Sequence, residues 1–172
     1  MQKVVIIGPE STGKSTLSEQ LAAHFRTLWA PEYARAYLDG LQRPYEEEDL
    51  YHIAMGQLAG EDAVAAAAPR PLVFCDTDLQ VVKVWSEHRY GHCDLRILEQ
   101  IAQRRYDLYL LTYIDIPWED DPQREHGDPQ MRQYFYNVYR DIVIQSGLPW
   151  ADIRGSFNDR LQTAVDAVNR LR

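Results

Sequence analysis

Short, continuous hydrophobic runs alternate along the chain with longer stretches that are typical of helices. Three runs have the pattern of strands buried on both faces, and they span residues 3–7, 72–75 and 108–111. Two shorter runs, 27–30 and 150–153, are further candidate strands. We predict helices over residues 15–25, 46–68, 78–88, 95–104, 129–145 and 158–171. Strands that alternate with helices of this length form βαβ units, so the pattern predicts an α/β fold with a parallel sheet of about five strands and helices on both faces.

The composition limits the class of protein. The 172 residues have the length of one domain, and we predict a single domain over 1–172. The 45% hydrophobic and 26% charged residues are ordinary globular values, which argue against a disordered or membrane-spanning protein. The net charge of −8 argues against a nucleic-acid partner, although a few local donors suffice to hold a small anion. Two cysteines, Cys75 and Cys93, and the lack of a secretory leader predict a cytoplasmic setting.

The strongest chemical signal follows the first predicted strand directly. Residues 8–15 match the phosphate-binding pattern G-x-x-x-x-G-K-[ST], and the candidate nucleotide-binding residues are Gly8, Pro9, Glu10, Ser11, Thr12, Gly13, Lys14, Ser15 and Thr16. Glycines allow backbone N–H groups to point at a polyphosphate, and the helix that begins here adds its partial positive charge. We expect Lys14 to act in catalysis at the β- and γ-phosphates of ATP, and the Ser15 hydroxyl to ligate Mg²⁺. The alternative is a glycine-rich turn with a solvated lysine, but the strand–turn–helix context favours the phosphate site.

Two acids follow the hydrophobic run that ends at residue 75. An acid at the end of a strand beside the P-loop strand can hold Mg²⁺ or its water shell, so Asp76 is a candidate metal ligand and catalytic residue. Asp78 is a candidate ligand of substrate hydroxyls. Either acid is also suited to cap the helix that follows.

A second candidate cluster, Glu32, Tyr33 and Arg35, follows the short strand 27–30. Ligands of open α/β sheets bind at the carboxyl ends of the strands, so we expect these side chains to face an acceptor substrate. An aromatic ring with an acid and an arginine suits a planar base that carries a sugar. The alternative is a helix start with Glu32 in its first turn.

Two weaker signals concern aromatic and loop residues. Trp85 is a candidate for lining the acceptor pocket, and a core position is its equal alternative. Residues 155–160 follow the last strand, where they are placed either to pack on a nucleotide base or to cap a helix through Ser156 or Asn158.

The composition of residues 116–132 predicts a mobile lid. The segment 116–128 contains two prolines, a glycine and many charges, which indicate a loop. Arg124 lies in this loop and Arg132 in the helix after it, and we expect both to neutralise charge on the transferring phosphoryl group. A solvated, charged loop is the alternative.

Together these residues resemble the ribosylnicotinamide kinase domain of NadR-type proteins. The matching pieces are GPESTGKST at 8–16, EYARAY at 32–37, DTD at 76–78 and PWEDDPQR at 117–124, in the expected order over most of the chain. The resemblance implies an adenylate-kinase-like P-loop fold and ATP-dependent phosphorylation of the ribose 5′-hydroxyl of nicotinamide riboside, which gives nicotinamide mononucleotide. It also implies that the adenylyltransferase half of bifunctional members is absent, because the chain begins at the kinase P-loop.

One position departs from the family's pattern. Members often carry a Trp directly before the Glu of the EYAR-like segment, where it stacks on nicotinamide, but here Pro31 stands in that place. Tyr33, Trp29 and Trp85 are the candidates to take over the stacking. We therefore predict a Mg²⁺- and ATP-dependent kinase with a small, nucleoside-like acceptor and no membrane partner. The alternatives are a kinase of another nucleoside or small alcohol, and a nucleotide-dependent binding module without catalysis.

Overall fold

Five strands form one parallel sheet in the order β2-β3-β1-β4-β5. In the computed structural model, which describes residues 1–171, they are β1 (Gln2–Ile7), β2 (Leu28–Ala30), β3 (Leu72–Asp76), β4 (Leu108–Thr112) and β5 (Trp150–Ile153). Each lies within one residue of a predicted strand, so the predicted α/β fold is confirmed. Because β1 lies in the middle of the sheet, the chain leaves it between the ends of β3 and β4.

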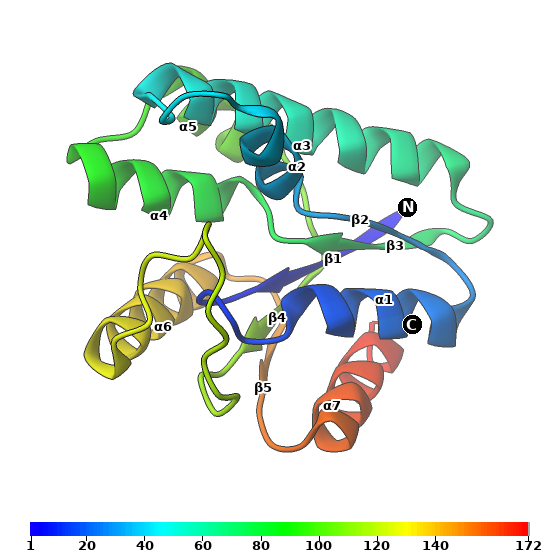
Figure 1. The fold of residues 1–172 in the computed structure, drawn as a ribbon. Coiled ribbons are helices and arrows are strands. Elements are labelled where there is room, and N and C mark those ends of the chain that lie inside the picture. The colour runs from blue at the N-terminus through cyan, green and yellow to red at the C-terminus, as the bar shows by residue number, and fades with distance from the viewer. Residues whose placement is uncertain (172) are drawn as a thin grey trace.

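Helices cover both faces of the sheet. They are α1 (Lys14–Phe25), α2 (Tyr33–Gly40), α3 (Glu47–Ala67), α4 (Leu79–Tyr90), α5 (Leu95–Gln103), α6 (Pro129–Gln145) and α7 (Phe157–Asn169). Figure 1 shows α1 and α7 together on one side of the sheet, and α3, α4 and α5 on the other. No helix within residues 1–171 combines the length and the apolar character needed to cross a lipid bilayer.

The side chains of β1 alternate between two hydrophobic cores. Val4 and Ile6 pack with α1 and α7, whereas Val5 and Ile7 pack with α4 and α6. All four side chains are fully buried. A strand that is covered on both faces has to be apolar at every position, which is why a continuous hydrophobic run predicts it so well.

The sequence pattern does not predict α2. None of its eight residues is fully buried, and its apolar face is short: Ala34, Tyr37 and Leu38 are partly buried against the core of α3, α4 and α5. The helix begins directly after Glu32, so the alternative interpretation of this cluster is right about a helix start, although Glu32 precedes the first turn instead of lying in it. Glu32 occupies the N-cap position, but within the described chain its side chain makes no capping hydrogen bond, which leaves the carboxylate for the site.

The register of the sheet gathers several strand ends at one edge. Ile6 of β1 pairs with Asp76 of β3, Ile7 of β1 pairs with Leu111 of β4, and β2 pairs with β3 up to residue 75. Four residues at or just beyond these pairs therefore meet at the carboxyl edge of the sheet: Gly8, Glu32, Asp76 and Thr112.

A buried acid lies in α3, away from this edge. Glu61 is fully buried, and the Tyr106 hydroxyl donates to its two carboxylate oxygens at 3.0 and 3.2 Å. Burial raises the pKa of Glu61 to about 7, and the charge of Asp78 adds to the increase, while Tyr106, Lys3 and Arg104 act in the opposite direction. The native protein thus retains a proton that the unfolded chain releases above the ordinary pKa of 4.5.

This difference predicts a pH-dependent stability. Between about pH 4.5 and about pH 7 the native state binds more protons at Glu61 than the unfolded state, so the contribution of Glu61 to stability falls as the pH rises through this window. Glu61→Gln keeps an acceptor for Tyr106 without the charge. We expect it to raise Tm relative to the natural protein at about pH 8, and the gain to be much smaller at about pH 5, near the lower end of this window. Thermal melts followed by circular dichroism measure both differences.

Glu99→Gln on α5 is the matched control, because Glu99 is exposed. It should leave Tm within error of the natural protein at both pH values. A gain for Glu61→Gln that is equal at both pH values would contradict the assignment of the titration to Glu61.

Candidate active site

The chain leaves β1 through Gly8, in a conformation that other residues rarely adopt. Gly8 has a φ of +152°, and a Cβ added to it would lie 2.7 Å from Thr112 O and closer still to Thr112 Oγ1. A side chain at this position would push the ends of β1 and β4 apart. The first glycine of the motif is therefore required by a backbone contact, independently of any ligand.

Residues 8–15, the P-loop, are held from two directions. Thr12 Oγ1 lies 2.7 Å from Pro9 O and 2.7 Å from Thr112 Oγ1, within hydrogen-bond distance of both. From α7, the buried Arg160 donates to Thr12 O and to Tyr113 O, at 3.0 Å each. The loop ends at the N-terminus of α1, where free N–H groups and the positive end of the helix dipole favour a phosphate.

Three cationic side chains surround the P-loop without an acidic partner among the ion pairs of residues 1–171. Lys14 Nζ donates to a P-loop carbonyl at 2.8 Å, and Arg124 donates to a carbonyl of the β4–α6 loop (residues 113–128) at 2.6 Å. Arg132 donates to one carbonyl of each loop, at 3.1 and 3.0 Å. Arg132 is only 8% exposed, its Nε has no hydrogen-bond partner within the described chain, and burial lowers its pKa. Positive charge of this kind is costly to bury unless an anion joins it.

Two carboxylates lie within the electrostatic reach of Lys14. Burial raises the pKa of both Glu32 and Asp76, and the charge of Lys14 opposes the increase. Ser15 Oγ donates to Asp76 Oδ2 at 2.5 Å, whereas Asp76 Oδ1 is buried without a partner among the described residues. Mg²⁺ prefers oxygen ligands and retains part of its water shell, so Ser15 and Asp76 fit a Mg²⁺ ion held directly or through water.

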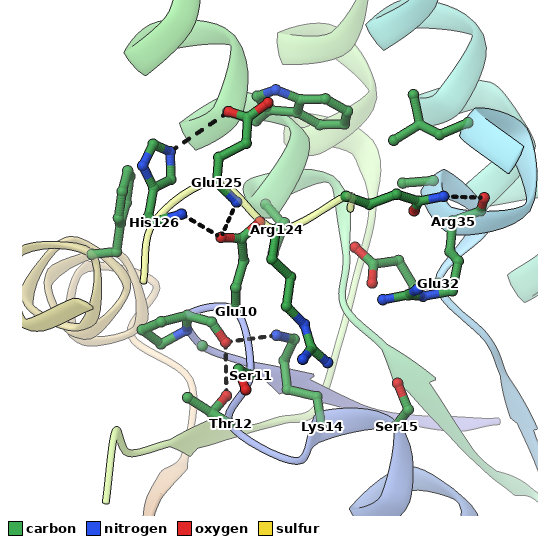
Figure 2. A pocket seen from close by; sticks show the side chains of 18 of the residues that line it. Glu10, Ser11, Thr12, Lys14, Ser15, Glu32, Arg35, Arg124, Glu125 and His126 are labelled. Atoms are coloured by element: carbon green, nitrogen blue, oxygen red, sulfur yellow. Dashed lines mark hydrogen bonds and ion pairs between the residues drawn. The ribbon is translucent and has the colours of Figure 1, made fainter. Parts of the chain in front are cut away.

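The P-loop and the β4–α6 loop enclose a cavity of about 480 Å³. Figure 2 shows Lys14 and Ser15 along one edge of it, with Arg124 pointing toward Lys14 from the opposite loop. The other end of the cavity is aromatic. Trp85 Nε1 donates to the Tyr45 hydroxyl at 3.1 Å, and the two rings meet edge to face with centroids 4.9 Å apart. This end suits a flat ring.

Most of the predicted site residues lie in this cavity. Those that line it are Gly8, Pro9, Glu10, Ser11, Thr12, Gly13, Lys14, Ser15, Thr16, Glu32, Arg35, Trp85, Arg124 and Arg132. Asp76 joins them through its hydrogen bond to Ser15. Phe157, at the start of α7, also lines the cavity, which places the segment 155–160 beside the P-loop even though Ser156 caps α7.

The structure corrects three of the candidate acceptor contacts, because none of them is among the described residues that line the cavity. The Tyr33 ring lies against Gly56 of α3, since α2 begins at Tyr33 and turns its side chain toward α3. Asp78 is buried, where it accepts a backbone N–H of α4 at 3.0 Å and the Tyr109 hydroxyl at 2.7 Å. It is a helix cap, as the alternative interpretation had it. Trp29 packs against the core beneath α1.

Much of the aromatic end of the cavity is not predicted from the sequence. The missed lining residues are Tyr45, His88, His126, Phe135 and Tyr139. Residue spacing indicates which of these residues share a helix face. His88 is three residues beyond Trp85 on α4, and Phe135 and Tyr139 are four residues apart on α6. Spacing alone does not separate a face that lines a cavity from one that packs in a core.

The fold and the P-loop define a nucleotide-binding protein of the P-loop kinase type. A sequence profile described as an AAA domain matches residues 3–160, and the chain belongs to this family. Two curated relatives are described as trifunctional NAD biosynthesis/regulator protein NadR, from Salmonella typhimurium strain LT2 and Escherichia coli strain K12. Each is 27% identical over 176 residues, which cover 99% of this chain and 43% of the relative. The chain thus spans less than half the length of these relatives.

Solved structures show the same relationship. A NadR protein in complex with NR superposes with a TM-score of 0.77 at 23% identity, over 99% of this chain and 49% of that one. A NadR protein in complex with NAD and AMP-PNP gives a TM-score of 0.74 at 25% identity, with the same coverage. Deoxyadenosine kinase from M. mycoides shares the fold, with a TM-score of 0.66 at 10% identity over 98% of this chain and 100% of that one. The predicted resemblance to NadR-type proteins is confirmed at the level of sequence and fold.

The contact at Gly8 predicts a severe effect of a single methyl group. We expect Gly8→Ala to lower the free energy of unfolding by about 2–4 kcal/mol, because the Cβ adds a clash with Thr112 to an unfavourable φ. It should also weaken ATP binding. Urea denaturation and nucleotide titration measure the two effects.

Gly60→Ala in α3 is the matched control. A Cβ at Gly60 meets no described atom within 4 Å, so this change should stabilise the protein by about 0.5–1 kcal/mol. Equal stability of the Gly8→Ala and Gly60→Ala proteins would disprove the close approach of β1 and β4.

Proposed function

We propose that the chain is a Mg²⁺- and ATP-dependent kinase that transfers the γ-phosphoryl group of ATP to the 5′-hydroxyl of a nucleoside, with nicotinamide riboside as the acceptor. The observation that carries this proposal is the distribution of charge in the cavity. The cations that surround the P-loop have no acidic partner within the described residues, whereas the arginines on the acceptor side are paired with acids.

At the phosphate end, Lys14, Arg124 and Arg132 supply the charge that a triphosphate needs. Phosphoryl transfer requires little covalent chemistry from the protein and depends on positioning and charge stabilisation. A guanidinium binds two phosphate oxygens at once, which suits Arg124 and Arg132 to the transferring group. Mg²⁺ held by Ser15 and Asp76 supplies further neutralisation of the phosphate charge when it is bound.

At the acceptor end, the arginines that line the cavity are neutralised. Arg35 pairs with Asp121 at 2.9 Å, and Arg43 pairs with Asp49 at 2.7 Å. A phosphate group on the acceptor would therefore meet no unpaired arginine on this side. This arrangement favours a nucleoside over a nucleoside monophosphate.

Glu32 is the residue best placed to bind the acceptor hydroxyl and accept its proton. Figure 2 shows its carboxylate between Arg35 and Ser15, at the junction of the two ends of the cavity. Its raised pKa strengthens it as a proton acceptor. We assign to Glu32 the orientation of the hydroxyl and the acceptance of its proton.

The aromatic end takes the base of the acceptor. Of the three candidates for stacking, Trp85 alone is among the residues that line the cavity, so we assign it this role. The NR in one NadR complex and the AMP-PNP in the other support nicotinamide riboside and ATP as the two substrates. The β4–α6 loop, together with Arg132 at the start of α6, acts as the lid that excludes water from the reaction.

An acceptor panel tests the proposal. ATP consumption with Mg²⁺ is measured against nicotinamide riboside, adenosine, uridine and thymidine 5′-monophosphate. We expect strong stimulation by nicotinamide riboside and none by the monophosphate. Stimulation by another nucleoside would identify that nucleoside as the acceptor. Stimulation by the monophosphate would contradict the inference that the paired arginines disfavour a phosphate group on the acceptor. Tight ATP binding without any stimulation would favour a binding module that lacks catalysis.

Lys14→Ala tests the phosphate end. We expect a loss of about a thousandfold in kcat with an unchanged Tm, because Lys14 is a cation without an acidic partner within residues 1–171 and its removal breaks no ion pair. Steady-state kinetics and thermal melts measure the two quantities.

Lys83→Ala is the charge-matched control, because Lys83 lies on α4 in an ion pair with Glu87 and does not line the cavity within the described structure. It should retain full activity. A folded Lys14→Ala protein with the activity of the natural protein would rule out the mechanism.

A further inference from the structure

The side chain of Glu10 leaves the P-loop and reaches the loop that faces it. Figure 2 shows its carboxylate directed at the β4–α6 loop, with two dashed contacts to that loop. Glu10 Oε2 accepts the backbone N–H groups of Glu125 and His126, at 3.1 Å each. In the G-x-x-x-x-G-K-[ST] pattern this position admits any residue, so the motif does not predict the contact.

The first half of the β4–α6 loop is fixed by other contacts. Ser11 Oγ accepts the backbone N–H of Glu119 at 3.0 Å. Asp121 is paired with Arg35 of α2, and Gln123 donates to Asp39 of α2 at 2.5 Å. The loop is therefore tied to the P-loop and to α2 on the N-terminal side of Arg124.

The second half of the loop is held by a different set of contacts. The His126 ring packs on Phe135 of α6, with centroids 4.8 Å apart, and the Glu125 side chain lies 3.4 Å from the Tyr45 hydroxyl. Glu10 supplies the hydrogen bonds to the backbone directly after Arg124. Arg124 thus lies between one anchor on α2 and one on the P-loop.

We propose that Glu10 is a positioning residue, which holds Arg124 over the P-loop by fixing the backbone that follows it. The inference rests on the proposed function, because Arg124 matters only where a phosphoryl group is transferred. Among residues 1–171 the Arg124 guanidinium has one hydrogen bond, to Glu119 O at 2.6 Å, so its place in the cavity is set mainly by its backbone. Displacement of a catalytic group by about 1 Å lowers a rate by up to about a hundredfold.

The charge of Glu10 suits this role. A carboxylate makes stronger hydrogen bonds to N–H groups than a neutral acceptor does. The same carboxylate would repel bound phosphates if it faced them, and the two N–H groups compensate its charge while the loop is closed. The two hydrogen bonds therefore partly offset the charge of Glu10 beside the P-loop in this structure.

The anchoring step is tested without any turnover. Hydrogen exchange of the loop is measured in the natural protein and in the Glu10→Ala, Glu10→Gln and Glu19→Ala proteins. We expect Glu10→Ala to speed exchange at the amides of residues 125 and 126 at least about tenfold, because each loses its acceptor. Glu10→Gln keeps an acceptor oxygen and should retain most of the protection. Glu19→Ala, an exposed acid on α1 with the same charge change, should have no effect.

The positioning step is tested by a double-mutant cycle. Glu10→Ala should lower kcat about 10- to 100-fold when Arg124 is present, with KM for ATP changed less than about threefold. In the Arg124→Ala protein the same change should lower kcat less than about twofold, because the group that Glu10 positions is already gone. Glu10→Gln should restore most of the activity.

Three results would overturn the inference. They are unchanged exchange at residues 125 and 126, an equal loss of kcat in both backgrounds, and a lower Tm with unchanged kcat. If the natural protein phosphorylates no nucleoside, the proposed function fails by itself. The exchange data still decide the anchoring, and the same cycle measured on ATP hydrolysis decides the positioning of Arg124.

Discussion

The close approach of β1 and β4 at Gly8 and Thr112 is the constraint on which the rest of the site depends. It fixes the point where the chain turns into the P-loop, and Thr12 returns to the same Thr112 side chain. The residue after Thr112 begins the β4–α6 loop, and Arg160 joins Thr12 to Tyr113 at that point. The phosphate-binding loop and the loop opposite it therefore start from one shared anchor, which keeps the two walls of the cavity in register.

The P-loop end of the site is rich in positive charge, whereas the net charge of the whole chain is negative. With a net charge of −8, the protein as a whole repels anions at long range. Around the P-loop, the hydrogen bonds that cations donate within the described chain go to main-chain carbonyls, while other arginines of the same cavity form ion pairs with carboxylates. Pairing some cations and leaving others unpaired suits one cavity to the two substrates that we propose, a polyphosphate at one end and an uncharged sugar at the other.

The sequence predicts those parts of the fold and site that are encoded locally. Buried parallel strands are apolar at every position, and a P-loop is a contiguous motif, so both are predicted correctly. Tyr33 and Asp78 follow strands just as Glu32 and Asp76 do, yet their side chains turn toward α3 and into the protein interior, respectively. The direction of these side chains depends on where each helix starts and on tertiary packing, and residue spacing along the sequence does not predict it. The aromatic end of the cavity, assembled from α4, α6 and the loops before α3 and α6, escapes prediction for the same reason.

The contacts of the β4–α6 loop have a consequence for the order of events in a catalytic cycle. The loop is tied to α2 on the acceptor side, through Asp121 and Gln123, and to the P-loop on the donor side, through Ser11 and Glu10. As the lid that we propose, this one loop would cover both ends of the cavity. Both products would then have to wait for the same opening of the loop, so their release would be correlated in time, and the lifetime of the closed loop would set a shared lower limit on how soon either product leaves.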